Sequence, residues 1–376
     1  MKSVTLAIVI CGILLGGAAY PAQPGNAEFL VGGDISMLAE IEDHGGVFRD
    51  DGKARDAMRI LRDHGCNCFR LRIFVDPDGH NAVVQDLQYT VKMAQRIKES
   101  GAKLLLDFHY SDTWADPGKQ IKPEAWEDLE FPALLQSVES YTEKVIARLR
   151  EAGVAPDIVQ PGNEIRPGMI WPDGKVTGEH NTEEQWDQLA DLLRAAIRGI
   201  RSAEGSGRSI QIMLHPGGPR WKGNRRFFDK LLERGVNFDL IGLSYYPWWH
   251  GGVDNLRRNL RRTANRYGRD IMVVETAYPY RDADRWKDDC ESGKNMAWPV
   301  SRAGQKQFLE DVVESVHATP EGRGKGVLWW YPESIPVRGL RIWHGGATAL
   351  FDSDGNALPA LDAFEASTQR SSDSNR

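Results

Sequence analysis

The 376-residue sequence predicts a single closed (β/α)8 barrel, an α/β fold, from two observations. Apolar, strand-like segments alternate with amphipathic, helix-like segments, and this alternation repeats eight times along the chain. Alternation favours a parallel sheet covered by helices, and eight units favour closure of the sheet into a barrel. An open, doubly wound sheet is the alternative. It would usually show a glycine-rich nucleotide loop after an early strand, and GGDIS at residues 32–36 lacks that pattern.

Each expected element follows from its own pattern. Runs rich in aliphatic and aromatic residues predict strands at residues 29–36, 68–75, 103–111, 158–165, 209–216, 239–247, 270–279 and 326–334. Apolar residues spaced three and four apart predict helices at residues 53–65, 87–101, 139–153, 183–203, 225–236, 253–268, 301–318 and 359–367. No linker or internal repeat interrupts this order, so we expect one domain over residues 23–367.

The two ends of the chain have different characters. Residues 1–22 combine an early lysine, a short apolar run and small residues, which is typical of a secretory signal peptide. An uncleaved anchor helix is the alternative, but the apolar run is short for a membrane span. We therefore expect a secreted or periplasmic monomer without a membrane anchor after cleavage. The polar tail at residues 368–376 is expected to be disordered.

Composition argues against several classes of protein. The net charge of −6 comes from mixed signs, which does not favour a nucleic-acid binder or a membrane-surface binder. After the leader, the chain holds Cys66, Cys68 and Cys290, so at most one disulfide can form within it. Cys-x-Cys without a nearby histidine pair is a poor zinc site. We expect no metal site and no cofactor from these residues.

Strand alternation predicts which charged side chains point into the barrel, because successive residues face opposite sides. In CFRLRIFV, at residues 68–75, one face is apolar and consists of Phe69, Leu71, Ile73 and Val75. Arg70 and Arg72 should therefore face inward. The same argument places Asp107 and His109 inside. Buried charges are costly unless they are paired, so carboxylates are expected near the two arginines.

Two glutamates end strands on opposite sides of the expected barrel. Glu164 closes the fourth strand and Glu275 closes the seventh, so the two carboxylates should face each other across the mouth. If they lie about 5 Å apart, they suit double-displacement glycoside hydrolysis. A single glutamate at a strand end is more often an ion-pair partner or a cap. Two of them, one preceded by Asn163, favour catalysis, and neither G-x-S-x-G nor H-E-x-x-H occurs.

Several longer motifs make the sequence resemble glycoside hydrolase family 53, the arabinogalactan endo-β-1,4-galactanases. They are GGDISMLAEIEDHGGVFRDDG, FRLRIFV, LLLDFHYSDTWADPGKQ, GNEIRPGMIWP, IGLSYYP, VVETAYP and GGATALFDSDGNALPAL, which span nearly the whole mature chain in family order. The resemblance implies a secreted retaining enzyme that hydrolyses β-1,4-galactan, the polysaccharide of type I arabinogalactan. The alternatives are a related enzyme acting on mannan, glucan or another β-linked polymer, and a non-catalytic carbohydrate-binding protein on this scaffold.

The resemblance also implies roles for individual residues. Glu164 would be the general acid/base, Glu275 the nucleophile, and Asn163 a hydrogen-bond donor to the sugar 2-hydroxyl. The other candidates for the substrate site are Arg70 and Tyr245 (holding Glu275), His109 (sugar hydroxyls or the proton balance near Glu164), Trp330 (below the sugar at the cleavage point), Trp114 and Trp171 (further subsites), and Asp34 and Asp112 (hydroxyls or loop ties). An interior structural histidine and simple loop packing of the tryptophans are the alternatives for those residues.

Three segments depart from the family pattern. HPGGPRW at residues 215–221 replaces an acidic stretch, and Trp330 is followed by Tyr331 and Pro332 in place of Glu-Pro. The loop at residues 281–295 lacks the Asp, His and Asn run that holds calcium in some relatives. The resemblance therefore leaves calcium binding and the subsites open.

Overall fold

The structure is a computed structural model that describes residues 28–373 except residues 81, 208 and 283–294. The expected signal peptide, Cys290 and the last three residues lie outside the described part. The final helix, α11 (Asp362–Asp373), continues into the tail that the sequence led us to expect to be disordered.

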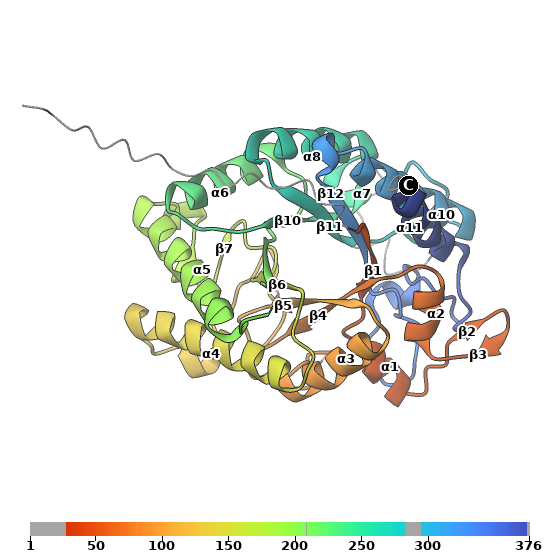
Figure 1. Cartoon of the computed structure of the whole chain (residues 1–376), viewed down its shortest axis with the longest axis horizontal. Coiled ribbons are helices and arrows are strands. Elements are labelled where there is room, and N and C mark those ends of the chain that lie inside the picture. Colours follow the sequence, from red (N-terminus) through yellow and green to blue (C-terminus); the bar gives the residue numbers. More distant parts are fainter. Residues whose placement is uncertain (1–27, 81, 208, 283–294, 374–376) are drawn as a thin grey trace, which may run out of the picture.

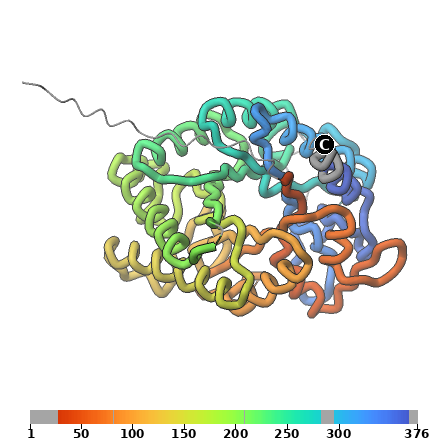
Figure 2. The backbone as a smooth tube through the Cα atoms, viewed as in Figure 1, coloured from red at the N-terminus to blue at the C-terminus, as the bar shows by residue number. Residues whose placement is uncertain are grey.

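Parallel strands close into a barrel, which confirms the predicted fold class (Figure 1). In chain order the barrel strands are β1 (Leu30–Asp34), β4 (Cys68–Ile73), β5 (Lys103–Phe108), β6 (Ile158–Pro161), β9 (Gln211–Leu214), β10 (Leu240–Tyr245), β11 (Asp270–Thr276) and β12 (Gly324–Trp330). Each strand pairs with its neighbours in the sequence of barrel strands, and β1 closes the ring by pairing with β12. Figure 2 shows this closure, where the red start of the described chain meets blue strand β12.

Helices surround the barrel and follow the strands as expected (Figure 1). Besides α11, the longer helices are α2 (Ala57–Asp63), α3 (Leu87–Glu99), α4 (Phe131–Glu151), α5 (Glu183–Ala203), α6 (Trp221–Glu233), α8 (Val253–Tyr267) and α10 (Arg302–His317). Four of them begin at an N-cap residue whose side chain accepts a hydrogen bond from a backbone N–H group. These N-cap residues are Asp56, Asp86, Thr182 and Ser301. No described helix is long and apolar enough to cross a membrane.

The loops hold small elements that the sequence pattern did not predict. Two short hairpins form, β2 (Arg49–Asp50) with β3 (Lys53–Ala54) and β7 (Gly168–Met169) with β8 (Gly174–Lys175). The short helices are α1 (Leu38–Asp43) and α7 (Pro247–His250). Single turns of 3-10 helix lie at Glu124–Trp126, Gly178–His180, Pro320–Gly322 and Trp343–Gly346. A further turn, Pro359–Leu361, begins the segment that was predicted as the last helix.

Two apolar layers form the core, one inside the barrel and one between the strands and the helices. The inner layer contains Leu30, Cys68, Leu105, Ile158, Met213, Leu240, Met272, Val274 and Leu328. In β4, Phe69, Leu71 and Ile73 belong to the outer layer, as alternation predicted. The barrel is tight at its first strand, because a Cβ at Gly32 would lie 2.0 Å from the carbonyl oxygen of Cys68.

The two described cysteines are buried thiols. Cys66 and Cys68 are both free, and burial raises the pKa of Cys68 to about 12. Because the thiolate is the reactive form, both are chemically protected in the folded chain.

Candidate active site

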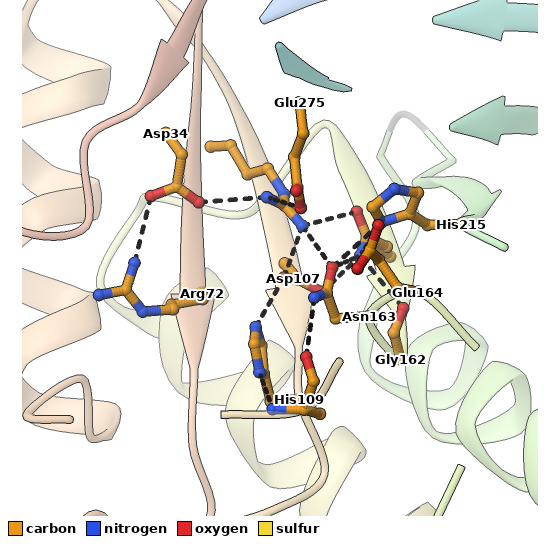
Figure 3. Close-up of polar contacts among 12 residues, drawn as sticks. Asp34, Arg72, Asp107, His109, Gly162, Asn163, Glu164, His215 and Glu275 are labelled. Carbon is orange, nitrogen blue, oxygen red and sulfur yellow. Dashed lines mark hydrogen bonds and ion pairs between the residues drawn. The ribbon is translucent and has the colours of Figure 1, made fainter. Parts of the chain in front are cut away.

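A cleft of about 910 Å³ opens where the barrel strands end. Its walls come from the loops after the strands, and both Glu164 and Glu275 line it, together with Asn163. Enzymes with this barrel carry their active sites at this end, because the side chains of several strand ends converge there. Figure 3 shows how these side chains gather from separate strands.

Arg70 on β4 is the centre of the polar network beneath the cleft. The side chain is fully buried. Its Nη1 donates to Glu275 Oε1 at 2.9 Å, and its Nη2 donates to Asp107 Oδ2 at 2.7 Å and to Asn163 Oδ1 at 2.9 Å. Asp34 Oδ2 lies 3.4 Å from Nη1. Arg70 therefore connects β1, β5, β6 and β11 through side chains, and it orients Glu275.

A β-bulge in β11 turns Glu275 into the cleft. Strict alternation would place Glu275 on the outer face with Val273, because Val274 already packs inside the barrel. The pairing register of β11 with both neighbouring strands shifts after Val273, so Glu275 lies opposite Ser244. An extra residue in a strand re-aims the side chain that follows it. The bulge thus lets two consecutive side chains face inward.

The backbone after β6 is equally specialised. Gly162 has φ 88° and Glu164 has φ 49°, in the left-handed region that costs a non-glycine residue roughly 1–2 kcal/mol. Such strain is found where the position of a side chain matters for function. The loop after β9 leaves space for the Glu164 side chain, because it carries Gly217 at the point of contact. A Cβ at Gly217 would lie 3.1 Å from Glu164 Oε1.

A hydrogen-bond chain leads away from Glu164. Ser244 Oγ donates to Glu164 Oε1 at 2.7 Å, and His215 Nε2 lies 2.9 Å from Ser244 Oγ. His215 Nδ1 lies 3.2 Å from Gln160 Nε2. Burial and the nearby Arg70 lower the pKa of His215 well below its usual value, so the ring is neutral. A neutral ring can donate from Nε2 to Ser244 and accept at Nδ1 from Gln160. Asn163 Oδ1 also lies 3.1 Å from Nδ1, but it accepts from Arg70 and Gln160.

The two cleft carboxyl groups differ in their partners. Burial raises the pKa of Glu164, opposed by the hydrogen bond from Ser244 and by the charge of Arg166. Burial also raises the pKa of Glu275, and Glu164 adds to this rise while Arg70 opposes it. Two such groups retain a shared proton near neutral pH. The ion pair with Arg70 favours the negative charge on Glu275, whereas Glu164 accepts from the neutral hydroxyl of Ser244, so Glu164 is our candidate for the protonated group.

The tyrosine beside Glu275 is Tyr246 and not Tyr245, which corrects the sequence prediction. Tyr246 Oη donates to Glu275 Oε2 at 3.2 Å, whereas Tyr245 Oη donates to the carbonyl of Gly251 at 3.0 Å. Tyr245 belongs to the outer core layer, and its ring stacks on Phe308. Burial and the charge of Glu275 raise the pKa of Tyr246, so it remains a protonated donor.

Two predicted sugar contacts lie below the cleft and do not line it. Asp34 is fully buried between Arg70 and Arg72, within 3.4 and 3.5 Å. His109 is also buried, with Nε2 3.1 Å from Asp107 Oδ2 and Nδ1 accepting from the backbone of Ala115. Figure 3 shows both connected to this polar network by dashed contacts. They support the site through charge pairing, in agreement with the alternative of an interior histidine.

Asp112 ties two loops together. One carboxylate oxygen accepts the N–H of Asp76 and the other accepts the N–H of Glu124, at 2.9 and 2.8 Å. This arrangement matches the second of its two expected roles.

The tryptophans divide between two surfaces. Trp330 and Trp114 line the cleft with their ring centroids 6.1 Å apart. The guanidinium of Arg72 lies 4.2 Å from the Trp114 ring, which fixes that side chain by a cation–π contact. Trp171 instead lines a separate groove of about 590 Å³ with Lys122.

Sequence reasoning missed several residues of the site. Ser244, Tyr246 and Gln160 face inward in the observed strands, and alternation through Leu240 and Gly242 could have identified the first two. The exposed Trp249, in the short helix α7, lines the cleft and left no periodic signal in the sequence.

A closed (β/α)8 barrel with paired glutamates, an Asn-Glu strand end and an aromatic-lined cleft is the architecture of a glycoside hydrolase that acts through two carboxyl groups. The sequence model described as "Glycosyl hydrolase family 53" matches residues 30–364. This chain therefore belongs to glycosyl hydrolase family 53.

Individual relatives agree with this assignment. The chain is 42% identical to an uncharacterised protein of Niallia circulans, over 90% of this chain and 94% of that one. It is 33% identical to a protein of Cellvibrio japonicus named arabinogalactan endo-β-1,4-galactanase, over 96% of both chains. Among solved structures, the family 53 catalytic domain of Ignisphaera aggregans is similar with a TM-score of 0.83 and 34% identity, over 92% of this chain and 97% of that one.

Proposed function

We propose that this protein is an endo-β-1,4-galactanase that hydrolyses β-1,4-galactan with retention of anomeric configuration. The observation that carries the proposal is the unequal pair of carboxyl groups in one cleft. Glu275 is ion-paired with Arg70 at 2.9 Å, and Glu164 has a neutral hydroxyl donor at 2.7 Å. The name of the Cellvibrio japonicus relative supports galactan as the polymer.

In the first step, a carboxylate oxygen of Glu275 attacks the anomeric carbon while Glu164 gives its proton to the glycosidic oxygen. The leaving sugar departs with the electron pair of the broken C–O bond, and the glycosyl group is left as an ester of Glu275. Arg70 and Tyr246 hold the attacking carboxylate by hydrogen bonds from two sides. These contacts set the orientation of the nucleophile before the substrate arrives.

In the second step, Glu164 acts as a base, because the charge on Glu275 has been lost to the ester and the pKa of Glu164 falls accordingly. It takes a proton from water, whose oxygen attacks the anomeric carbon and releases Glu275. The hydroxyl of Ser244 stabilises the ionised Glu164 during this step.

Asn163 is placed to hold the sugar during both steps. Its Oδ1 accepts from Arg70, and one N–H of its amide donates to the carbonyl of Ala115 at 2.9 Å. The second N–H of the amide remains as a donor to a sugar hydroxyl. If that group is the 2-hydroxyl, the hydrogen bond strengthens as positive charge develops at the anomeric carbon. Trp330, at the cleft wall, offers an aromatic face to the apolar face of the ring.

Purified protein assayed on galactan, mannan and β-glucan tests the activity, and proton NMR of the first products tests the stereochemistry. We expect galacto-oligosaccharides from galactan alone, with the β-anomer appearing first. Release of oligosaccharides from mannan or β-glucan instead would contradict the proposed polymer.

We also propose that the protein acts as an exported monomer without a cofactor. Gel filtration, culture-fraction assays and activity after chelation of metals test those points.

The Glu275→Ala variant tests the nucleophile against the alternative of a non-catalytic binding protein. Turnover should disappear while the far-UV circular dichroism spectrum and binding of galacto-oligosaccharides persist. Added azide should restore some turnover of Glu275→Ala by attacking the anomeric carbon in place of the carboxylate. In Glu164→Ala, azide should instead attack the ester of Glu275, so the glycosyl azides from the two variants should be opposite anomers. An unchanged rate in Glu275→Ala would mean that the nucleophile is misassigned.

A further inference from the structure

The half of the cleft beside Glu164 is positively charged. Since Glu164 protonates the leaving-group oxygen in the proposed function, on which this inference rests, that half receives the leaving-group sugars. Arg166 follows Glu164 on the loop after β6. Arg220 lies on the loop after β9, beyond Gly217, which packs against the Glu164 carboxyl group. Lys119 lies on the loop after β5, and all three cations line the cleft.

These three cations lie on neighbouring parts of the barrel rim, because β5, β6 and β9 are consecutive strands in the ring. The chain as a whole carries a net charge of −6, so this group of cations at one end of the cleft has the opposite sign to the net charge of the protein. A cleft lined by one sign of charge concentrates ligands of the opposite sign.

The described hydrogen bonds of the two arginines do not neutralise their charges, although the nearby Glu164 carboxyl group acts on Arg166. Arg166 is half-buried, and its Nη1 donates to the carbonyl of Gly218 at 3.2 Å and to Asn224 Oδ1 at 3.1 Å, both neutral groups. Arg220 is exposed and forms no ion pair within the part of the chain that the structure describes. The two charges lie close enough that Arg220, together with burial, lowers the pKa of Arg166.

The other titratable groups at this end do not cancel the charge. Burial and the two arginines lower the pKa of His250 to about 3, so that ring is neutral under working conditions. Asp116 contributes one carboxylate to this wall, and its Oδ1 accepts the backbone N–H groups of Gly118 and Lys119. Asp78, on the loop after β4, also lines the cleft, and so does Arg341. The arginine and lysine side chains that line the cleft thus outnumber Asp78 and Asp116, the carboxylates outside the catalytic pair.

We propose that the leaving-group half of the cleft binds sugars that carry carboxylate groups, so that the preferred substrate is galactan joined to uronic acid residues on its leaving-group side. Guanidinium groups bind carboxylates through two parallel N–H···O bonds, which a neutral hydroxymethyl group cannot match. A bound uronate would relieve the repulsion between Arg166 and Arg220. The enzyme would then cut galactan close to its junction with an acidic polysaccharide.

The test compares two forms of one substrate. The acidic form is a fragment in which short galactan chains remain joined to a uronate-containing backbone, and the neutral form is the same fragment with its carboxyl groups reduced to hydroxymethyl groups. We expect kcat/KM to be about three- to tenfold higher for the acidic form, between the values for an exposed ion pair and for a charge-assisted hydrogen bond. Raising the salt concentration should reduce this ratio.

Three variants separate a direct contact from a general effect of charge. Arg220→Gln should remove most of the preference, and Arg220→Lys should keep part of it because the charge remains without the planar pair of donors. Lys222→Gln is the matched control, since it removes the same charge from an exposed residue of α6 that does not line the cleft. The Lys222 variant should keep the ratio of the unmodified enzyme.

Equal kcat/KM values for the two forms would overturn this inference, as would a loss in Lys222→Gln as large as that in Arg220→Gln. In both cases hydrolysis of neutral galactan would still stand. An enzyme that fails on neutral and acidic galactan alike would overturn the proposed function itself.

Discussion

Replacing Arg70 with methionine should destabilise the protein strongly, because methionine keeps the apolar stem and removes every donor. The substitution leaves Asp107 and Glu275, at present 2.7 and 2.9 Å from the guanidinium, without this cation, and it leaves Asp34, at 3.4 Å, with Arg72 alone. Removal of one partner from a buried ion pair typically costs about 3–5 kcal/mol. We expect the free energy of unfolding to fall by at least that amount at neutral pH.

Guanidinium chloride unfolding, followed by far-UV circular dichroism, measures this change. A thermodynamic cycle sharpens it, because Asp107→Asn removes one of the carboxylates that Arg70 neutralises. Arg70→Met should therefore cost less in the Asp107→Asn background, with a coupling energy of about 1–3 kcal/mol. A loss below about 1 kcal/mol in Arg70→Met, or additive costs in the double variant, would refute the view that charge pairing holds this network.

Ser244, Tyr246 and the fully buried Glu333 each give a further prediction. Ser244→Ala should move the alkaline limb of the kcat/KM profile to higher pH, because Ser244 lowers the pKa of Glu164 and the acid must be protonated; Ser244→Thr should keep the limb in place. Tyr246→Phe should lower kcat by about 10- to 100-fold with little change in unfolding midpoint, by loss of one hydrogen bond to a charged group. Burial raises the pKa of Glu333, so its ionisation destabilises the fold as pH rises from the unfolded pKa towards the folded one. Glu333→Gln should therefore lose less stability than the unmodified protein as the pH rises above the unfolded glutamate pKa of about 4.3, measured by denaturant titration.

Much of the fold could be predicted from sequence because it depends on repeated, local patterns. Eight alternations of strand and helix give a barrel regardless of the loops, and period-two alternation correctly turned Arg70 and Arg72 inward. The positions of Glu164 and Glu275 at the ends of two strands were then enough to predict that both side chains lie in one cleft.

The details of the site depend on exceptions to those patterns. Glu275 faces the cleft only because β11 contains a bulge, and no residue type in VVET marks an extra residue. Tyr245 and Tyr246 are chemically identical, so choosing between them required counting inward positions through β10. The positive charge of Arg166 and Arg220 in the cleft comes from two loops that lie side by side only once β6 pairs with β9.

The position of Arg70 has a consequence for the order of events in biogenesis. Its side-chain partners come from strands at the beginning, middle and end of the chain, in Asp34, Asp107, Asn163 and Glu275. A chain that ends before Glu275, or one half of the barrel alone, lacks at least one of them and cannot orient the nucleophile. Recovery of turnover during refolding would therefore require that β1, β4 and β11 have come together, which makes catalysis a reporter of contact between distant parts of the chain.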